Sequence, residues 1–221
     1  MDKIIKNLDT IFARAHESCA RVGRLIDSFE IVPATKTRDR NAIMALAQDG
    51  RIKTCGENRV QEFISKYTSM IEWDMIGQLQ TNKVKYIIDK IRLIQSVDRV
   101  ELLEEINKRA GAINKVQKVL LEINTGAEDS KGGVKFNDIH CLALKTTEYK
   151  NIELSGIMAV APFNIDKNSL RKLFMKTNDV FIQLKQGFNT VKYLSMGMSE
   201  DFEIALECGA NIIRPGRIIF E

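Results

Sequence analysis

The chain has 221 residues, of which 28% are charged and 44% hydrophobic, and its formal net charge is +4. This length allows one large domain or two small ones with a substantial buried core, and the composition is that of a globular protein. Apolar runs stay well below the roughly 18 residues of a membrane-spanning helix, and basic residues alternate with acidic ones, which excludes a membrane anchor and a basic arm for nucleic acid.

The N-terminal segment, residues 1–22, carries charges throughout and apolar residues at helical spacing. It therefore predicts an amphipathic helix rather than a signal peptide. The four cysteines are far apart, and His16 and His140 both lie in predicted helices. This pattern argues against a zinc site and against a Ser-His-Asp triad. Scattered thiols fit a reducing compartment, so we expect a cytoplasmic protein.

Short apolar segments and amphipathic segments alternate along the rest of the chain. The apolar segments predict strands at 30–35, 51–55, 73–77, 92–97, 118–124, 154–160, 191–196 and 211–216. The amphipathic segments predict helices at 40–48, 59–67, 82–89, 99–110, 136–147, 169–185 and 200–209. Such alternation is typical of a parallel sheet covered by helices.

Eight strand–helix units favour a closed (β/α)₈ TIM barrel, for which ~250 residues is the usual size. An open doubly wound sheet is the alternative, but the Gly-x-Gly-x-x-Gly motif that it would carry after the first strand is absent. No linker or repeat interrupts the pattern, so we expect residues 1–221 to form a single domain. The longest loop, residues 124–136, should be exposed and mobile because of its glycines and charges.

In a barrel, active sites lie at the C-terminal ends of the strands. The polar or glycine residues that follow the predicted strands are therefore candidates: Lys36, Glu57, Asn58, Gly77, Gln78, Ser96, Asp98, Asn124, Ser195 to Ser199 and Arg214 to Arg217. Some of them can be structural, since Asp98 is also placed to cap the helix that begins near Arg99.

Lys36 follows the first strand within the segment PATKTRD. A lysine in this position is most often a solvated surface charge. A reactive lysine needs an apolar wall or a neighbouring cation that favours the neutral amine. Val32 and Ala34 could provide the wall, and Arg214 the cation, because strands one and eight adjoin in a closed barrel.

The last two strands are followed by a candidate anion site. The segment SMGMSEDF, residues 195–202, runs from a strand through glycine into a helix, with Ser199 as the expected N-cap. In RPGR, residues 214–217, Gly216 lets backbone N–H groups approach an anion closely. The first segment alone is typical of an ordinary turn, but barrels often bind phosphate at these two adjacent loops.

These segments, together with CGENRVQEF and WDMIGQLQTNKVKYI, resemble the YggS/PROSC-type pyridoxal phosphate homeostasis proteins from about residue 30 to the C-terminus. The resemblance implies a fold similar to the N-terminal domain of alanine racemase (fold type III) that holds pyridoxal 5′-phosphate (PLP) as an aldimine on Lys36. Asn58 would lie beside the cofactor ring, and Arg214 would face the pyridine nitrogen. The implied phosphate ligands are Ser195, Gly197, Gly216 and the backbone amide of Arg217.

The chain departs from the family pattern at several positions. Asp74 and Gln78 stand where the family often has histidines, and Glu221 stands where it usually has glycine. Arg217 replaces a Ser or Thr, so the hydroxyl contact to phosphate is in doubt. Its guanidinium would either strengthen phosphate binding or point to solvent or pair with Glu221.

The resemblance leaves a carrier and an enzyme as alternatives. An arginine at the ring nitrogen leaves that nitrogen unprotonated and weakens the electron sink on which PLP chemistry depends. Racemases of this fold also take a second base from a further domain, for which we expect no room after the eighth strand. We therefore predict a carrier or regulator in vitamin B6 homeostasis without efficient catalysis. An amino-acid racemase is the alternative, and a sugar-phosphate enzyme, which would be colourless, is a third possibility.

The predicted partners follow from the carrier interpretation. We expect PLP as the ligand and PLP-dependent apoenzymes as candidate recipients of it. We expect a monomer, and no membrane or specific nucleic-acid partner.

Overall fold

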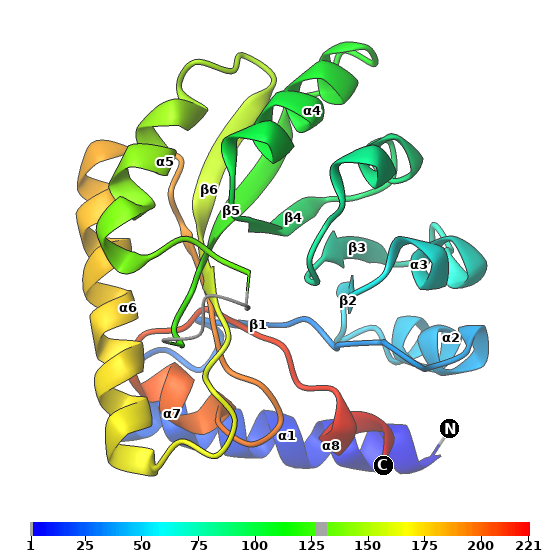
Figure 1. Cartoon of the computed structure of the whole chain (residues 1–221). Coiled ribbons are helices and arrows are strands. Elements are labelled where there is room, and N and C mark those ends of the chain that lie inside the picture. Colours follow the sequence, from blue (N-terminus) through cyan, green and yellow to red (C-terminus); the bar gives the residue numbers. More distant parts are fainter. Residues whose placement is uncertain (1, 127–131) are drawn as a thin grey trace.

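The computed structural model describes residues 2–126 and 132–221, and its eight parallel strands form one sheet in the order β1-β8-β7-β6-β5-β4-β3-β2. The strands are β1 (Glu30–Ile31), β2 (Thr54–Glu57), β3 (Glu72–Met75), β4 (Leu93–Val97), β5 (Gln117–Ile123), β6 (Ile152–Ala159), β7 (Tyr193–Ser195) and β8 (Ile212–Ile213). The helices are α1 (Asp2–Arg21), α2 (Arg40–Asp49), α3 (Val60–Lys66), α4 (Val100–Gly111), α5 (Ile139–Thr146), α6 (Lys167–Gly187), α7 (Phe202–Glu207) and α8 (Arg217–Phe220), with 3₁₀ turns η1 (Thr81–Tyr86) and η2 (Phe136–Asp138). Figure 1 shows the helices around the outside of the strands.

The two ends of the sheet meet, so the strands close into a barrel. On one side β1 pairs in parallel with β8. On the other side Ala34 forms a parallel bridge with Gly56 of β2, and the Thr35 N–H donates to the Gly56 carbonyl at 2.9 Å. Pro33 has no N–H to donate, but its carbonyl accepts the Gly56 N–H at 2.8 Å, and Ala34 continues the hydrogen bonds to the β8 side. The predicted (β/α)₈ barrel is confirmed, and the open doubly wound alternative is wrong.

Each predicted strand and helix overlaps an observed element, but several details differ. The segment predicted as a helix at 82–89 is mostly the 3₁₀ turn η1. Ser199 does not cap α7, whose N-cap is Asp201. Asp98 does not cap α4 either, because the N-cap is Arg99 and the Asp98 carboxylate pairs with the Arg99 guanidinium at 2.5 Å. In both cases the side chain that was expected to cap a helix binds another partner instead: Gly216 for Ser199, and Arg99 for Asp98.

The loop predicted to be exposed and mobile is described only in part. Residues 127–131 lie outside the described residues, so that prediction stays untested. On its N-terminal side the loop leaves β5, and on its C-terminal side the Val134 N–H donates to the Glu122 carbonyl at 2.7 Å. The two described ends of the loop therefore stay next to β5.

The inside of the barrel is partly apolar and partly polar. Five apolar side chains from different strands pack together there: Val32, Leu93, Leu120, Met158 and Ile212. A larger apolar cluster lies between the strands and the helices. Asp74, Gln95, Ser195 and Arg214 are also fully buried. Polar groups at such depth need hydrogen-bond partners, and those partners position the site described below.

The N-terminal helix α1 packs against α7 and α8, so both ends of the chain lie on the same side of the barrel in Figure 1. The Asn7 side-chain amide donates to the Ile219 carbonyl at 3.0 Å and ties α1 to α8. Within residues 2–126 and 132–221, no helix has the length and apolar character that crossing a membrane would require.

Candidate functional site

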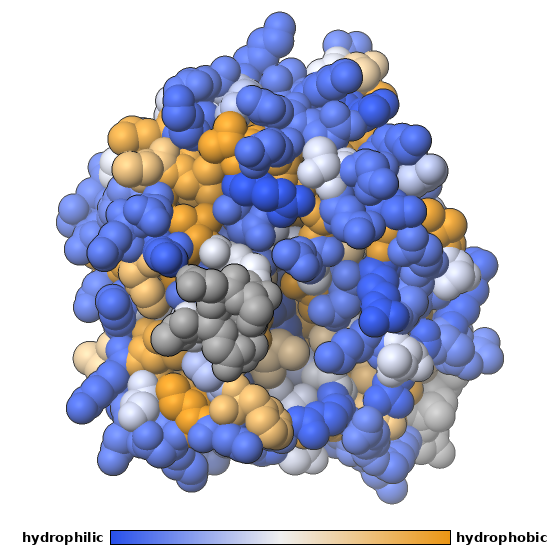
Figure 2. Space-filling model, viewed as in Figure 1, coloured by the Kyte–Doolittle hydropathy of each residue, from blue (hydrophilic) through white to orange (hydrophobic). Residues whose placement is uncertain are grey.

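A cavity of about 920 Å³ opens where the strands end. Its lining comes from segments that follow most of the strands and includes Lys36, Asn58, Gln78, Asn124, Ser199 and Gly216. This is the C-terminal face of the barrel, where enzymes of this fold place their active sites. Figure 2 shows this face, with a hollow near its centre.

About half of the residues that were selected because they follow predicted strands line the cavity. Those in the lining are Lys36, Asn58, Gly77, Gln78, Asn124, Met198, Ser199, Gly216 and Arg217. Those outside the lining are Glu57, Ser96, Asp98, Ser195, Met196, Gly197, Arg214 and Pro215. Several of the second group hold the first group in place, as their hydrogen bonds show.

Lys36 lies in the loop after β1, and its exposed side chain lines the cavity. In the described part of the chain, no hydrogen bond or ion pair engages its amine. Ala34 contributes to the same wall, whereas Val32 points into the apolar cluster inside the barrel. The expected apolar wall is therefore supplied by Ala34 and not by Val32. An amine without a partner in a concave wall is available to a ligand.

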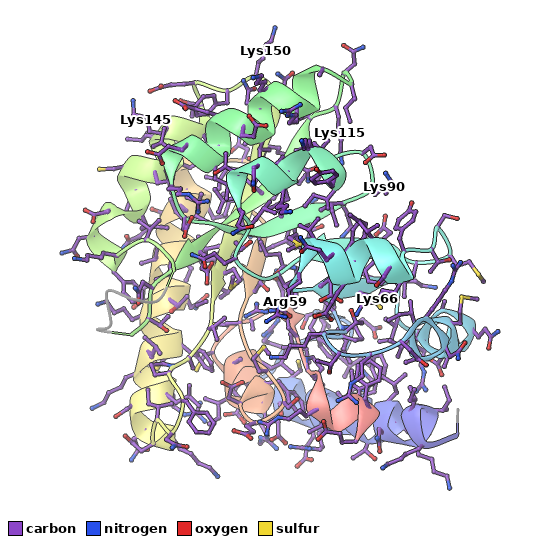
Figure 3. The ribbon with its side chains drawn as sticks, turned by 45° about the vertical axis from the view of Figure 1, so that its right-hand side comes forward. Arg59, Lys66, Lys90, Lys115, Lys145 and Lys150 are labelled. Carbon is purple, nitrogen blue, oxygen red and sulfur yellow. The ribbon has the colours of Figure 1, made fainter. Side chains whose placement is uncertain are left out.

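A buried ion pair holds the segments on both sides of this wall. Lys66, at the end of α3, pairs with Glu57 at 2.7 Å and donates to the Thr35 carbonyl at 2.8 Å and the Arg38 carbonyl at 3.2 Å. The Glu57 carboxylate also accepts the Asn58 N–H at 2.7 Å. The pair thus fixes the backbone next to Lys36 and next to Asn58. Figure 3 shows Lys66 on α3. From the sequence, Lys66 resembled an ordinary basic residue in the last turn of a helix.

Asn58 has an unused hydrogen-bonding atom in the cavity. Its side-chain oxygen Oδ1 is buried and has no hydrogen-bond partner among the described residues. Gly77 lies against it, and a Cβ at Gly77 would stand 2.4 Å from the Asn58 carbonyl oxygen. The absence of a side chain at Gly77 therefore lets the ends of β2 and β3 approach each other. An unpaired buried acceptor beside a cavity fits a ligand that brings a donor.

Ser199 and Gly216 meet in the lining of the cavity. The Ser199 Oγ accepts the Gly216 N–H at 3.1 Å and the Ile218 N–H at 3.5 Å. Because Oγ accepts these bonds, its own proton remains available for another acceptor. A Cβ at Gly216 would lie 3.1 Å from the Ala34 carbonyl oxygen. This corner therefore offers a hydroxyl donor to an anion, close to the wall that carries Lys36.

Arg217 lies at the rim of the cavity and is exposed. Its guanidinium pairs with Glu200 at 2.5 Å, and the two side chains are 60% and 67% exposed. Glu221 pairs with Arg38 at 2.8 Å instead. The interpretation in which Arg217 pairs with Glu221 is therefore wrong. The Ser199 hydroxyl lies in the same lining and is a group of the type that a Ser or Thr at position 217 would have provided.

Ser195, Gly197 and Arg214 lie outside the lining. Ser195 Oγ donates to Gln95, and Arg214 donates to Ser195 Oγ and to the Ala159 carbonyl at 2.8 Å. Gly197 has φ +98°, and a Cβ there would stand 2.7 Å from the Ala205 Cβ. Packing against α7 thus accounts for Gly197. Cofactor contacts by these three residues stay predictions.

Glu122 lines the cavity and was not selected from the sequence. The pKa of its carboxyl is raised to about 7, mainly by burial and also by the charge of nearby Asp98, against an opposing effect of Arg214. Glu122 is two residues from Leu120 on β5, so both side chains point into the barrel. An acid inside the apolar run KVLLEIN was the signal that could have identified it.

Metal binding finds no support in the described residues, among which no group of three or more His, Cys, Asp or Glu side chains could hold an ion. His16 packs between Phe12 and Phe29, with ring centroids 6.0 Å and 5.7 Å away. His140 shares a hydrogen bond with Gln183 at 3.1 Å. Neither histidine lines the cavity.

Comparison with known proteins gives consistent matches. The family model for the N-terminal domain of alanine racemase matches residues 10–221. A pyridoxal phosphate homeostasis protein from Aquifex aeolicus is 40% identical over 97% of this chain and 96% of its own length. A crystal structure of an unknown protein from Bifidobacterium adolescentis has a TM-score of 0.93 and 32% identity, covering 99% and 95% of the two chains. PipY of Synechococcus elongatus with PLP bound has a TM-score of 0.81 and 26% identity, covering 94% and 100%.

Proposed function

The chain belongs to the family of pyridoxal phosphate homeostasis proteins, and from this premise we propose that it binds PLP and takes part in intracellular vitamin B6 balance without efficient catalysis. One observation carries the proposal. The Lys36 amine lines a cavity without a partner among the described residues, and the Ser199 hydroxyl lies in the same lining. A ligand that joins an aldehyde to a phosphate matches both groups.

The residues of the cavity fit this ligand. Lys36 is the amine that would hold the aldehyde covalently. Ser199 and the Gly216 loop would receive the phosphate, and the unpaired Asn58 Oδ1 would face the ring or its substituents. The Arg217 backbone N–H remains a proposed phosphate donor, as do Ser195 and Gly197 through their loop. Bound PLP supplies an electron sink, which Arg214 would moderate at the ring nitrogen.

The first test is covalent labelling. Purified protein loaded with PLP should be yellow, and borohydride reduction should leave the label on the peptide that contains Lys36. The Lys36→Ala variant should fold normally and lose the colour. Lys53→Ala is the matched control, because Lys53 is exposed and lies outside the main cavity. A label on Lys53 or Lys83 in the wild-type protein would overturn the assignment.

The racemase alternative needs a separate test, because Glu122 gives the cavity a carboxyl that can exchange a proton near neutral pH. Efficient racemisation requires positioned acid–base groups on both faces of the ring, each contributing ~10²–10⁴-fold. We expect the PLP-loaded protein to convert L-amino acids to D-amino acids only slowly. A turnover number near the enzyme median of ~10 s⁻¹, abolished by Lys36→Ala, would make the protein a racemase.

The carrier role also implies partners and a location. We propose a monomeric, cytoplasmic protein of one domain that passes PLP to apoenzymes. Loaded protein should activate a PLP-dependent apoenzyme even when a large excess of a PLP-trapping enzyme removes the free aldehyde. Activation that stops when the trap is added would mean release into solution rather than transfer.

A further inference from the structure

A continuous set of hydrogen bonds crosses the inside of the barrel and ends at Arg214. Arg92 donates to both oxygens of the Asp74 carboxylate, at 2.8 Å and 2.7 Å. Gln95 Nε2 donates to Asp74 Oδ2 at 2.7 Å. Ser195 Oγ donates to Gln95 Oε1 at 2.6 Å, and Arg214 Nη1 donates to Ser195 Oγ. These bonds link β3, β4, β7 and the end of β8.

The three bonds from Arg214 to Asp74 all have the same direction, and Arg92 donates to Asp74 from the other side. Arg214 donates to Ser195, Ser195 donates to Gln95, and Gln95 donates to Asp74. The acceptor at the end is a carboxylate, so its charge orients each donor in turn and strengthens the bonds cooperatively. Ser195 uses its only proton on Gln95, and its oxygen is therefore left to accept from Arg214.

Arg214 depends on this set for its position. Its side chain is 1% exposed, and no carboxylate among the described residues lies within ion-pair distance of it. Glu122 and Asp201 act on it only through their charge, while burial lowers the pKa of its guanidinium to about 10. A buried guanidinium that lacks a paired carboxylate needs its hydrogen bonds to stay in one orientation.

We propose that Asp74, Gln95 and Ser195 are positioning residues that hold the Arg214 guanidinium in one orientation beside the cofactor cavity and so set how the protein binds PLP. This inference rests on the proposed function. It assigns the Ser195 hydroxyl a role through Arg214, which leaves the backbone of its loop for the proposed contact with phosphate. It also gives the chain's Asp74, which replaces a common histidine of the family, a specific partner in Arg92.

The decisive variants remove or keep one hydroxyl. Ser195→Ala breaks the set of bonds, whereas Ser195→Thr keeps a hydroxyl at the same position. Thr54→Val is the matched control, because the Thr54 Oγ1 is buried in the same barrel and has no hydrogen-bond partner among the described residues. The dissociation constant for PLP and the pH titration of the absorbance of bound PLP are measured for each protein.

We expect Ser195→Ala to weaken PLP binding about tenfold, as for the loss of one hydrogen bond to a charged group. The pH midpoint of the absorbance should move upward, because a loosened guanidinium opposes protonation of the ring nitrogen less. Ser195→Thr should restore the dissociation constant to within about threefold of the wild-type value and return the pH midpoint to its wild-type position, and Thr54→Val should leave both unchanged. If Ser195→Ala does not fold, Gln95→Met breaks the same set of bonds and should give the same two changes.

Two outcomes would overturn the inference. One is a Ser195→Ala protein with wild-type affinity and pH midpoint. The other is Thr54→Val changing both values as much as Ser195→Ala or Gln95→Met, which would mean that barrel packing alone is responsible. If the wild-type protein does not bind PLP, the proposed function fails instead, so the two failures can be distinguished.

Discussion

Single residues beside the cavity are held by groups that lie outside it. Lys36 itself has no partner among the described residues, but the carbonyl of the residue before it accepts a hydrogen bond from Lys66 at 2.8 Å. Thr37, the residue after it, has φ +64° and donates its N–H to Glu62 at 2.8 Å. The backbone is therefore fixed on both sides of Lys36 while its side chain stays free. That combination suits a residue that must reach a ligand from a defined position.

The Glu57–Lys66 pair should be essential for this arrangement. Both side chains are at most 5% exposed. Lys66→Met leaves the Glu57 carboxylate buried without its partner, so we expect a loss of about 3–5 kcal/mol of unfolding free energy. PLP affinity should fall as well, because the loop before Lys36 loses its anchor. Denaturant unfolding and PLP titration measure the two effects.

Lys145→Met is the matched control for this prediction. Lys145 pairs with Glu148 at 2.8 Å on the surface of α5, where both side chains are more than half exposed, and Figure 3 shows it far from Lys66. We expect no measurable change in stability or PLP affinity. A Lys66→Met protein as stable as Lys145→Met would contradict the role given to the buried pair.

At the scale of elements, the alternation of apolar and amphipathic segments was enough to predict the barrel. It could not predict which neighbour each polar side chain selects. The turn before α7 illustrates this limit, because Ser199 has the local pattern of an N-cap but accepts the Gly216 N–H from a loop seventeen positions later. Gln95 was likewise predicted to lie in a strand, as it does, but the pattern could not show that its side chain bonds to residues of β3 and β7.

The candidate site was predictable to a similar extent. Lys36, Asn58 and Gly216 follow strands and line the cavity. Lys66 and Glu122 could not be selected by that rule, since one ends a helix and the other lies within a strand. Their importance comes from burial, which depends on how the whole barrel closes.

The close approach of β2 and β3 at their C-terminal ends gives an element-scale prediction. A Cβ at Gly77 would lie 2.4 Å from the Asn58 carbonyl oxygen and 2.6 Å from its Cα. Backbone must move to accept it, so Gly77→Ala should cost about 1–3 kcal/mol and displace Asn58 from the cavity wall. Thermal unfolding should show the destabilisation, and PLP titration the weaker binding.

Gly187→Ala is the control for the glycine substitution. Gly187 ends α6, and no atom lies within 4 Å of its added Cβ. Alanine loses less backbone entropy than glycine in a helix, so stability should stay equal or rise by up to about 1 kcal/mol. If Gly77→Ala behaves like Gly187→Ala, the close approach is not needed.

The carboxyl groups of the whole molecule fall into two classes, whose pKa values are shifted in opposite directions. On the surface, hydrogen bonds and cations lower the pKa of several carboxyls, among them Asp49, Glu62 and Glu203. Inside the barrel, burial raises the pKa of Asp74 to about 6 and that of Glu122 to about 7. The outer groups stabilise the fold above their unfolded pKa values. The inner groups destabilise the fold as the pH rises above their unfolded pKa values, because their ionisation is disfavoured in the folded state.

Glu122 should therefore make the protein less stable as the pH rises. The folded state keeps the Glu122 proton up to about pH 7, whereas the unfolded chain loses it near the reference pKa of about 4.3. Between these values the folded state binds more protons, so the unfolding free energy contributed by this group decreases as the pH rises. Glu122→Gln removes the ionisation and keeps the shape, so its stability should fall less over this window and exceed that of the wild-type protein at pH 7. Denaturant unfolding of both proteins at a series of pH values in the absence of PLP tests this, and parallel curves for the two would show that Glu122 ionises in the folded protein as it does in water.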